Sequence, residues 1–285
     1  MKKNILFIII ASFGIFSCSK SDDVATQITT ILPKKIIDID RYGSSESLIS
    51  YSGNKIKEIS SIYYSNNNDI LNSKTIYTYN GDLITKNEVF EINLLKASDD
   101  YIYENSRLKM LIHKDYGFNQ TPGLITKKIY TYNQDGTILL ENYDIDIFTG
   151  IETKTDNSTT YTLDNSNIIK KVSDSSYYNY YNPNTQTYYR STITYEYDDK
   201  INPFKNVTGL DKINMNFLNK NNIIKSTNFY QTSTDKVLYS APSPLTVTNY
   251  NLIYESNNHL KESKYDEVRS SSIPEIFTNV TQYFY

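Results

Sequence analysis

The chain holds few residues whose types and spacing would support catalysis or metal binding. Its two histidines, His113 and His259, each occur alone, without cysteines or carboxylates at the spacing of a metal site. We therefore expect both to be solvent-facing strand residues. The sequence contains no Gly-x-Ser-x-Gly elbow and no glycine-rich phosphate loop. These observations predict neither a metal ion nor a cofactor.

Some carboxylates could still be paired for acid–base chemistry. Asp144 with Asp146, or Glu141 with Asp144, would be a glycosidase pair if the carboxyl groups lay about 5 to 9 Å apart. Such spacing is common on strands, so it does not by itself predict an enzyme.

Residues 133–136, Asn-Gln-Asp-Gly, match part of a calcium loop, but the remaining ligands and the closing glutamate are missing. We interpret them as a turn and predict a protein that is not an enzyme.

Tyrosines form the remaining candidate for a binding site. Six of the 28 tyrosines lie within residues 177–189, on either side of a predicted turn at Pro183-Asn184. Tyrosine offers large, rigid, amphipathic contact area, which is typical of binding surfaces. The alternative is a longer hairpin with both faces aromatic, half of it core. The residues predicted to bind a ligand under the first interpretation are Tyr178, Tyr180, Tyr181, Tyr188 and Tyr189.

A different chemistry is predicted at the single cysteine, Cys18. Lys2 and Lys3 precede an apolar run at residues 5–16, which is too short to span a bilayer as a stable helix. This order is typical of a secretory signal. Residues 15–18, Ile-Phe-Ser-Cys, resemble a bacterial lipobox, and the resemblance implies cleavage just before Cys18 and acylation of its thiol. An ordinary cleaved signal peptide and an uncleaved anchor are the alternatives.

The predicted signal divides the chain into three parts. We expect a lipoprotein signal peptide at 1–17, a lipidated flexible tether at 18–32, and a single all-β domain at 33–285. No second long apolar run follows, so no transmembrane helix is predicted. The net charge of -3 leaves no basic footprint for nucleic acid. The predicted partners are therefore the membrane, through the lipid, and a glycan or an envelope protein.

A recurring pattern supplies the elements that would position these residues. Two aromatic or apolar residues, two positions apart, precede an Asn/Asp/Gly/Ser cluster and then an aliphatic residue, most clearly at 75–86 and 128–138. Residues two apart share one face of a strand, and Asn80-Gly81 is a strong hairpin signal, so each copy predicts a hairpin. The weaker copies run from Ile49/Tyr51 to Ile56, Tyr101/Tyr103 to Leu108, Tyr161/Leu163 to Ile168, Tyr195/Tyr197 to Ile201, Met215/Phe217 to Ile223 and Leu252/Tyr254 to Leu260.

About eight hairpins predict an all-β fold with about sixteen strands. Open twisted sheets rarely exceed about ten strands. We therefore expect a long antiparallel meander, curled into a barrel-like or two-layered sheet. Residues 202–210 break the pattern and predict a loop with one helical turn. Residues 277–285 alternate in polarity, which predicts a strand built into the sheet.

The repeated pattern resembles the tyrosine–aspartate (YD, Rhs-type) repeat. The whole arrangement of lipobox, tether and tyrosine-rich hairpins is similar to bacterial lipoproteins of unknown function with a porin-like fold. Leu163 and Phe217 depart from the repeat, because each replaces its second tyrosine. The resemblance implies the fold and lends no catalytic residue. Asp22-Asp23 also resembles an export tag for the cell surface.

These observations lead to one functional hypothesis and two alternatives. We expect a lipid-anchored protein of the outer membrane, at the cell surface, that binds glycan or protein through an aromatic-rich β surface without catalysis. The alternatives are a structural or assembly subunit of an outer-membrane complex and a glycan-acting enzyme, and the lipid could also lie in the periplasmic leaflet. A membrane-embedded barrel would need an apolar outer band. That band would carry Lys127, Lys170, Lys171 and Lys225, so we expect a tethered domain.

Overall fold

The computed structural model describes residues 31–66, 70–117, 120–179, 182–215, 218–269 and 275–285. The chain divides into two units, Met1–Thr30 and Ile31–Tyr285, and the described residues all belong to the second. The predicted signal, Cys18 and most of the predicted tether lie outside the described residues.

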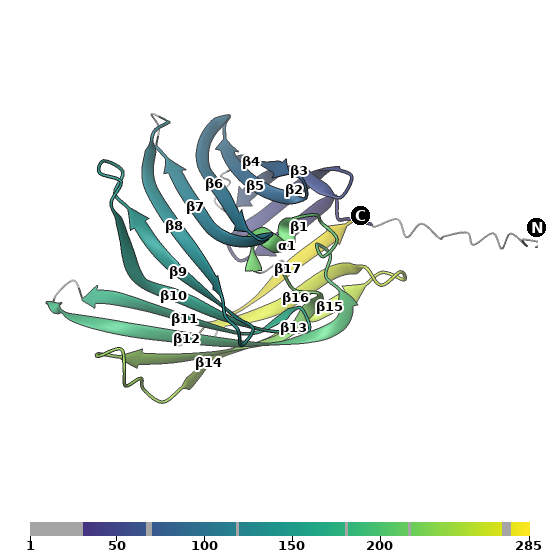
Figure 1. The fold of residues 1–285 in the computed structure, drawn as a ribbon. Helices are drawn as coiled ribbons and strands as arrows, with labels where there is room; N and C mark the ends of the chain where they lie inside the picture. The colour runs from purple at the N-terminus through teal and green to yellow at the C-terminus, as the bar shows by residue number, and fades with distance from the viewer. Residues whose placement is uncertain (1–30, 67–69, 118–119, 180–181, 216–217, 270–274) are drawn as a thin grey trace, which may run out of the picture. The chain divides into compact units, whose positions relative to one another are not determined.

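The second unit is one antiparallel sheet of 17 strands, in which strands adjacent in sequence are also adjacent in space. The first strand pairs with both the second and the last, so the sheet curls into a nearly closed barrel (Figure 1). This confirms the predicted all-β meander. The strands are β1 (Lys35–Asp40), β2 (Gly43–Ser52), β3 (Lys55–Ser65), β4 (Ile70–Asn80), β5 (Leu83–Glu91), β6 (Leu94–Glu104), β7 (Arg107–Tyr116), β8 (Pro122–Tyr132), β9 (Thr137–Ile145), β10 (Glu152–Asp164), β11 (Asn167–Asn179), β12 (Asn182–Ile201), β13 (Asn221–Ser233), β14 (Ser243–Asn249), β15 (Asn251–Tyr254), β16 (Leu260–Arg269) and β17 (Glu275–Phe284).

The repeated sequence pattern produces the same local structure in each hairpin. The aliphatic residue after the turn points into the barrel and is almost completely buried in six hairpins: Ile56, Ile84, Leu108, Ile138, Ile168 and Leu260. In most of these hairpins the residue after the buried aliphatic one has no partner on the neighbouring strand and forms a β-bulge. Thr85, between Ile84 and Lys86, is an example. A bulge bends its strand and increases the local twist. The recurring bulges therefore supply the curvature that closes the sheet.

The second tyrosine of the repeat joins its hairpin to the preceding one. The hydroxyl of Tyr103 donates a hydrogen bond to the carbonyl oxygen of Ile84 over 2.6 Å. Tyr197 makes the equivalent bond to Ile168, also over 2.6 Å. Leu163 lacks the hydroxyl and cannot make this bond. The tyrosines of the repeat thus contribute both apolar packing and a specific polar contact between neighbouring hairpins.

Two of the predicted copies do not form separate hairpins. Strand β12 continues through Ile201, where a turn was expected, and the described residues 202–215 and 218–220 then lie outside the barrel wall before β13 begins. Met215 lies in this excursion and is buried, while Phe217 lies outside the described residues. The predicted hairpins Tyr195/Tyr197 to Ile201 and Met215/Phe217 to Ile223 are therefore wrong. The sequence between β12 and β13 alternates in polarity like a strand, but its described residues fill the barrel instead of extending the barrel wall.

This excursion, residues 202–215 and 218–220, is called the plug. It contains α1 (Leu210–Ile213), which the strands surround in Figure 1. The predicted loop with one helical turn is thus confirmed, with the helical turn just after the loop. Leu210 and Ile213 are buried, as are Val207 and Met215. They pack among the inward side chains of the barrel wall and complete its core.

The plug is fixed to the tight turns at one end of the barrel. The amide of Thr208 donates to the carbonyl oxygen of Asn54 in the β2–β3 turn over 2.9 Å, and the amide of Lys220 donates to Ser166 in the β10–β11 turn over 3.1 Å. We call this end, where the turns after β2, β4, β6, β8, β10 and β15 gather, the plug end. The opposite end, with the connections after β1, β3, β5, β7, β9, β11, β13 and β16, is called the rim.

Candidate functional site

The plug and the barrel wall enclose a cavity of about 350 Å³, which we call the cup. Leu210, Ile213 and Met215 of the plug form one side of it. Inward side chains of the wall form the rest, because alternate residues of each strand face the barrel interior. The polar and aromatic groups that line the cup are Tyr77, Asn87, Asp99, Tyr101, His113, Lys128, Tyr130 and Tyr161.

A hydrogen-bonded network of polar side chains runs along the cup wall. His113 lies between two carboxylates, with Nδ1 2.7 Å from Asp99 and Nε2 3.1 Å from Asp115. The Tyr101 hydroxyl donates to Asp99 over 3.3 Å and accepts a hydrogen bond from Asn87 Nδ2 over 2.8 Å. These contacts orient five side chains from β5, β6 and β7. The wall therefore presents preorganised donors and acceptors rather than mobile side chains.

One atom of the network is left without a partner. The Oδ1 of Asn87 is buried and has no hydrogen-bond partner among the described residues. An unsatisfied buried acceptor costs about 1–3 kcal/mol.

The tyrosines of the cup are hydrogen-bond donors over the whole physiological pH range. Burial raises the pKa of Tyr77 to about 12, and the nearby Asp99 carboxylate adds to the effect. Burial also raises the pKa of Tyr101 and Tyr130. Their hydroxyl groups therefore stay protonated and neutral.

The cup adjoins a largely apolar cavity of about 280 Å³ between the plug and strands β1 to β4 and β17. The two cavities share Tyr77 and Leu210. Ile36, Ile49 and Ile59 line the second cavity. The barrel interior thus offers a polar side and an apolar side next to each other, which suits a ligand that has both.

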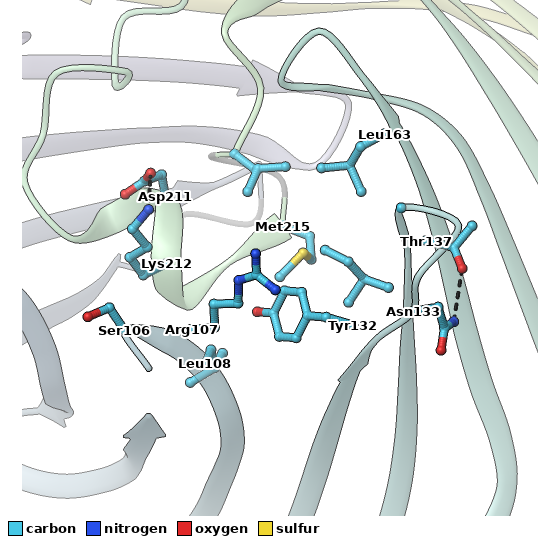
Figure 2. A pocket seen from close by; sticks show the side chains of 13 residues that line it. Ser106, Arg107, Leu108, Tyr132, Asn133, Thr137, Leu163, Asp211, Lys212 and Met215 are labelled. Atoms are coloured by element: carbon cyan, nitrogen blue, oxygen red, sulfur yellow. Dashed lines mark hydrogen bonds and ion pairs between the residues drawn. The ribbon is translucent and has the colours of Figure 1, made fainter. Parts of the chain in front are cut away.

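Another cavity, of about 310 Å³, lies at the plug end between the plug and the turns (Figure 2). Arg107 stacks over the ring of Tyr132, 5.3 Å from its centroid, and Lys212 lies 3.0 Å from Asp211. The charged groups here already have partners in the fold. The cup, with its hydrogen-bonded network of Asp99, Tyr101 and His113, is the stronger candidate for a ligand site.

The structure separates two of the predicted ligand-binding tyrosines. Neighbouring residues of a strand face opposite sides of a sheet. Tyr188 lies on the outer wall, where its hydroxyl donates to Gln186 over 2.8 Å. Tyr189 faces the interior, with its ring centroid 5.6 Å from that of Tyr230. These two side chains therefore do not form one surface.

The other three predicted residues cannot be placed. The backbone of Tyr178 belongs to β11, but its side chain is not among the described parts, and Tyr180 and Tyr181 lie outside the described residues. A ligand-binding role for the five tyrosines stays a prediction.

The expectation that both histidines face solvent is wrong. His113 is half-buried inside the barrel, and His259 lies in the β15–β16 turn with its ring centroid 4.9 Å from that of Tyr285. A signal for His113 was present in the sequence. His113 is two residues after Leu111, and Asp99 is two before Tyr101, so each shares a face with a core residue.

One predicted carboxylate pair is split, because Glu141 and Asp144 are three positions apart on β9 and face opposite sides of the sheet. Glu141 lies on the outer wall and forms an ion pair with Lys154. Asp146 accepts hydrogen bonds from the amides of Phe148 and Thr149 in a rim turn. Across the described ranges, no three His, Cys, Asp or Glu side chains form a group that could hold a metal ion.

The outer wall is rich in charged side chains that are paired with one another. Lys127 pairs with Glu152, and Lys225 lies 2.6 Å from Glu196. Lys171, expected on the same wall, faces the interior, because it lies opposite Tyr161 in the ladder. In the described part of the chain, no helix is long and apolar enough to cross a membrane.

Comparisons with known proteins found structural likeness only. No family model and no curated protein matches the sequence. The fold is similar to a porin-like protein from Bacteroides vulgatus ATCC 8482, with 10% identity, a TM-score of 0.49, and coverage of 89% of this chain and 98% of that one. It is also similar to a porin-like protein from Bacteroides uniformis ATCC 8492, with 11% identity, a TM-score of 0.48, and coverage of 90% and 98%. The strand pairing of the chain itself makes it an antiparallel all-β sheet that is nearly closed into a barrel.

Proposed function

We propose that the protein is a lipid-anchored binding protein of the bacterial envelope, and that it holds a small hydroxylated ligand, such as a glycan, in the cup without catalysis. The order of charged, apolar and small residues before Cys18 supports export and acylation. The paired charges of the outer wall favour a tethered domain over a barrel whose wall faces lipid.

The cup is the observation that carries this proposal. The plug closes the barrel on one side and turns its interior into a concave site of the size that small ligands occupy. Asn87, Asp99, Tyr101 and His113 line it, and their hydrogen bonds fix their geometry.

The chemistry of the cup fits a sugar ring. Sugars present hydroxyl groups at their edges and C–H groups on their faces. Carboxylate, amide and phenol groups can bind the hydroxyls. Tyr77, Tyr130 and Tyr161 offer aromatic area for the apolar faces.

A substitution pair on β6 provides the test. Asp99 faces the cup, while Asp100 faces outward and lies 2.9 Å from Lys114. In a glycan-array screen followed by calorimetry, we expect Asp99→Ala to weaken the best ligand at least about tenfold, the scale of a lost hydrogen bond to a charged group. Asp100→Ala should leave the affinity unchanged.

The opposite outcome would favour the tyrosine surface predicted from the sequence. If Tyr188→Ala abolished glycan binding while Asp99→Ala did not, the ligand would bind the outer wall and the cup would be excluded.

Mass spectrometry of the mature amino terminus tests the lipid, because an unmodified Cys18 thiol would contradict the anchor. Protease shaving of intact cells tests display at the cell surface.

An assembly role is the second candidate. The observation in its favour is the apolar rim described below, since exposed apolar side chains often mark contact surfaces. Recovery of a defined envelope complex, without affinity for any glycan, would support it.

A further inference from the structure

The two ends of the barrel differ sharply in the side chains they expose. Turns at the plug end are polar, as in Gly53-Asn54, Gly81-Asp82 and Asn105-Ser106. The rim is apolar. The ten most exposed large hydrophobic side chains among the described residues all belong to it: Tyr42, Ile70, Leu71, Ile92, Phe148, Ile151, Tyr177, Val237, Leu238 and Ile276. We call these the rim hydrophobics.

Ile92 lies where its residue type is least expected. The β5–β6 turn has positive φ at both central residues, 49° at Ile92 and 63° at Asn93. Glycine or asparagine is favoured at such positions, and a β-branched residue there is strained. Ile92 is also 86% exposed, so burial in the fold does not compensate for the strain. Its presence is understandable if the side chain is buried against something outside the molecule.

Two other rim tips are held rigidly in place. Phe148 is 90% exposed, and Asp146 accepts hydrogen bonds from the amides of Phe148 and Thr149 over 3.0 and 2.7 Å. Asp235 accepts bonds from the amides of Val237 and Leu238, both over 2.9 Å. The fold therefore presents these apolar side chains outward in a fixed conformation.

We infer that the rim hydrophobics insert into the interfacial layer of a lipid bilayer, so that the barrel stands on the membrane at its rim and the open side of the cup faces the lipid headgroups, from which its ligand would enter. The apolar side chains lie on separate turns spaced around the barrel mouth. A fluid lipid layer can surround each tip, whereas a folded partner would need one contiguous surface.

The length of chain before the barrel agrees with this orientation, and this step rests on the proposed lipid at Cys18. Strand β1 begins at Lys35, at the plug end, because Lys35 pairs with Leu48 and Phe284. Strands of ten to thirteen residues span about 33–43 Å. Fifteen residues, 18–32, can extend about 50 Å. The tether is long enough to run from the plug end to a membrane at the rim.

Tryptophan probes give a direct test, since the sequence contains no tryptophan. Residues 31–285 contain the whole sheet and its core, so this part can be made alone, without the lipid. With vesicles of phosphatidylethanolamine and phosphatidylglycerol, Phe148→Trp should give blue-shifted emission that brominated acyl chains quench. Gln134→Trp, in a plug-end turn, is the matched control and should show neither effect.

Two further variants measure how much the rim contributes. Phe148→Ser should lower partition into vesicles by about tenfold to a hundredfold, the effect of one buried apolar side chain. Ile92→Asn should lower partition by about tenfold while leaving the protein folded, because asparagine suits the turn. Added salt should change little, since the contacts are apolar.

Absence of a blue shift at Phe148→Trp, or an equal shift at Gln134→Trp, would overturn the inference. So would a dimer in size-exclusion chromatography that Ile92→Asn dissociates, because the rim would then cover a second copy. The test uses unacylated protein and no glycan. Its outcome is therefore independent of whether Cys18 is acylated or the cup binds a sugar.

Discussion

Gly209 offers the sharpest test of how the plug is seated in the barrel. It precedes α1 with φ of 78°, a left-handed conformation that costs other residues about 1–2 kcal/mol. A Cβ at Gly209 would also lie 2.7 Å from the backbone oxygen of Asp82 and 3.3 Å from Ile84. Gly81 has a similar φ of 56°, but a Cβ there would have no atom within 4 Å. The two glycines therefore separate backbone strain from steric contact.

Gly81→Ala should destabilise the protein by about 1–2 kcal/mol, through strain alone. Gly209→Ala should cost about 1–3 kcal/mol more, because the plug must move away from the β4–β5 turn. Urea unfolding curves would measure both values. Hydrogen exchange should also show faster exchange of the Thr208 amide in Gly209→Ala only. Equal destabilisation by the two substitutions would refute the close seating of the plug.

Three other predictions follow from the barrel wall and the rim. Tyr103→Phe should lower the free energy of unfolding by about 1 kcal/mol through loss of the bond to Ile84, and an unchanged urea midpoint would contradict that role. Ile92→Asn should raise thermal stability by about 1 kcal/mol by relieving strain in the turn, and calorimetry showing a lower melting temperature would argue against strain. Burial raises the pKa of Tyr77 and Tyr79 from 10 to about 12, so their contribution to stability is complete below pH 10 and is lost as pH rises through 12. Circular dichroism and tyrosinate absorbance should show unfolding and ionisation together in that range, and independent transitions would contradict the coupling.

The barrel wall was largely predictable, because its pattern is local. Alternation and turn residues determine which side chains share a face, and Ile56 and Leu108 are buried as the pattern predicts. The C-terminal strand was also predicted, and β17 pairs with both β16 and β1.

The plug could not be predicted, because its place depends on tertiary structure. Met215 and Phe217 show the same alternation in sequence as a strand, and only closure of the barrel creates the space that the plug fills. The cup was missed for the same reason. Asp99 and His113 lie on different strands, and the register of β6 with β7 brings them together.

The pairing of β1 with β17 has a consequence for how the protein is made. Asp38 and Thr281 share a hydrogen bond although they are 243 positions apart in the sequence. Contacts of such long separation form late and slowly. Until they form, both terminal strands leave backbone groups open to other chains. Incompletely folded molecules would thus be the species most prone to aggregate, and a lesion in β17 should reduce the yield of folded protein more than one at the barrel mouth.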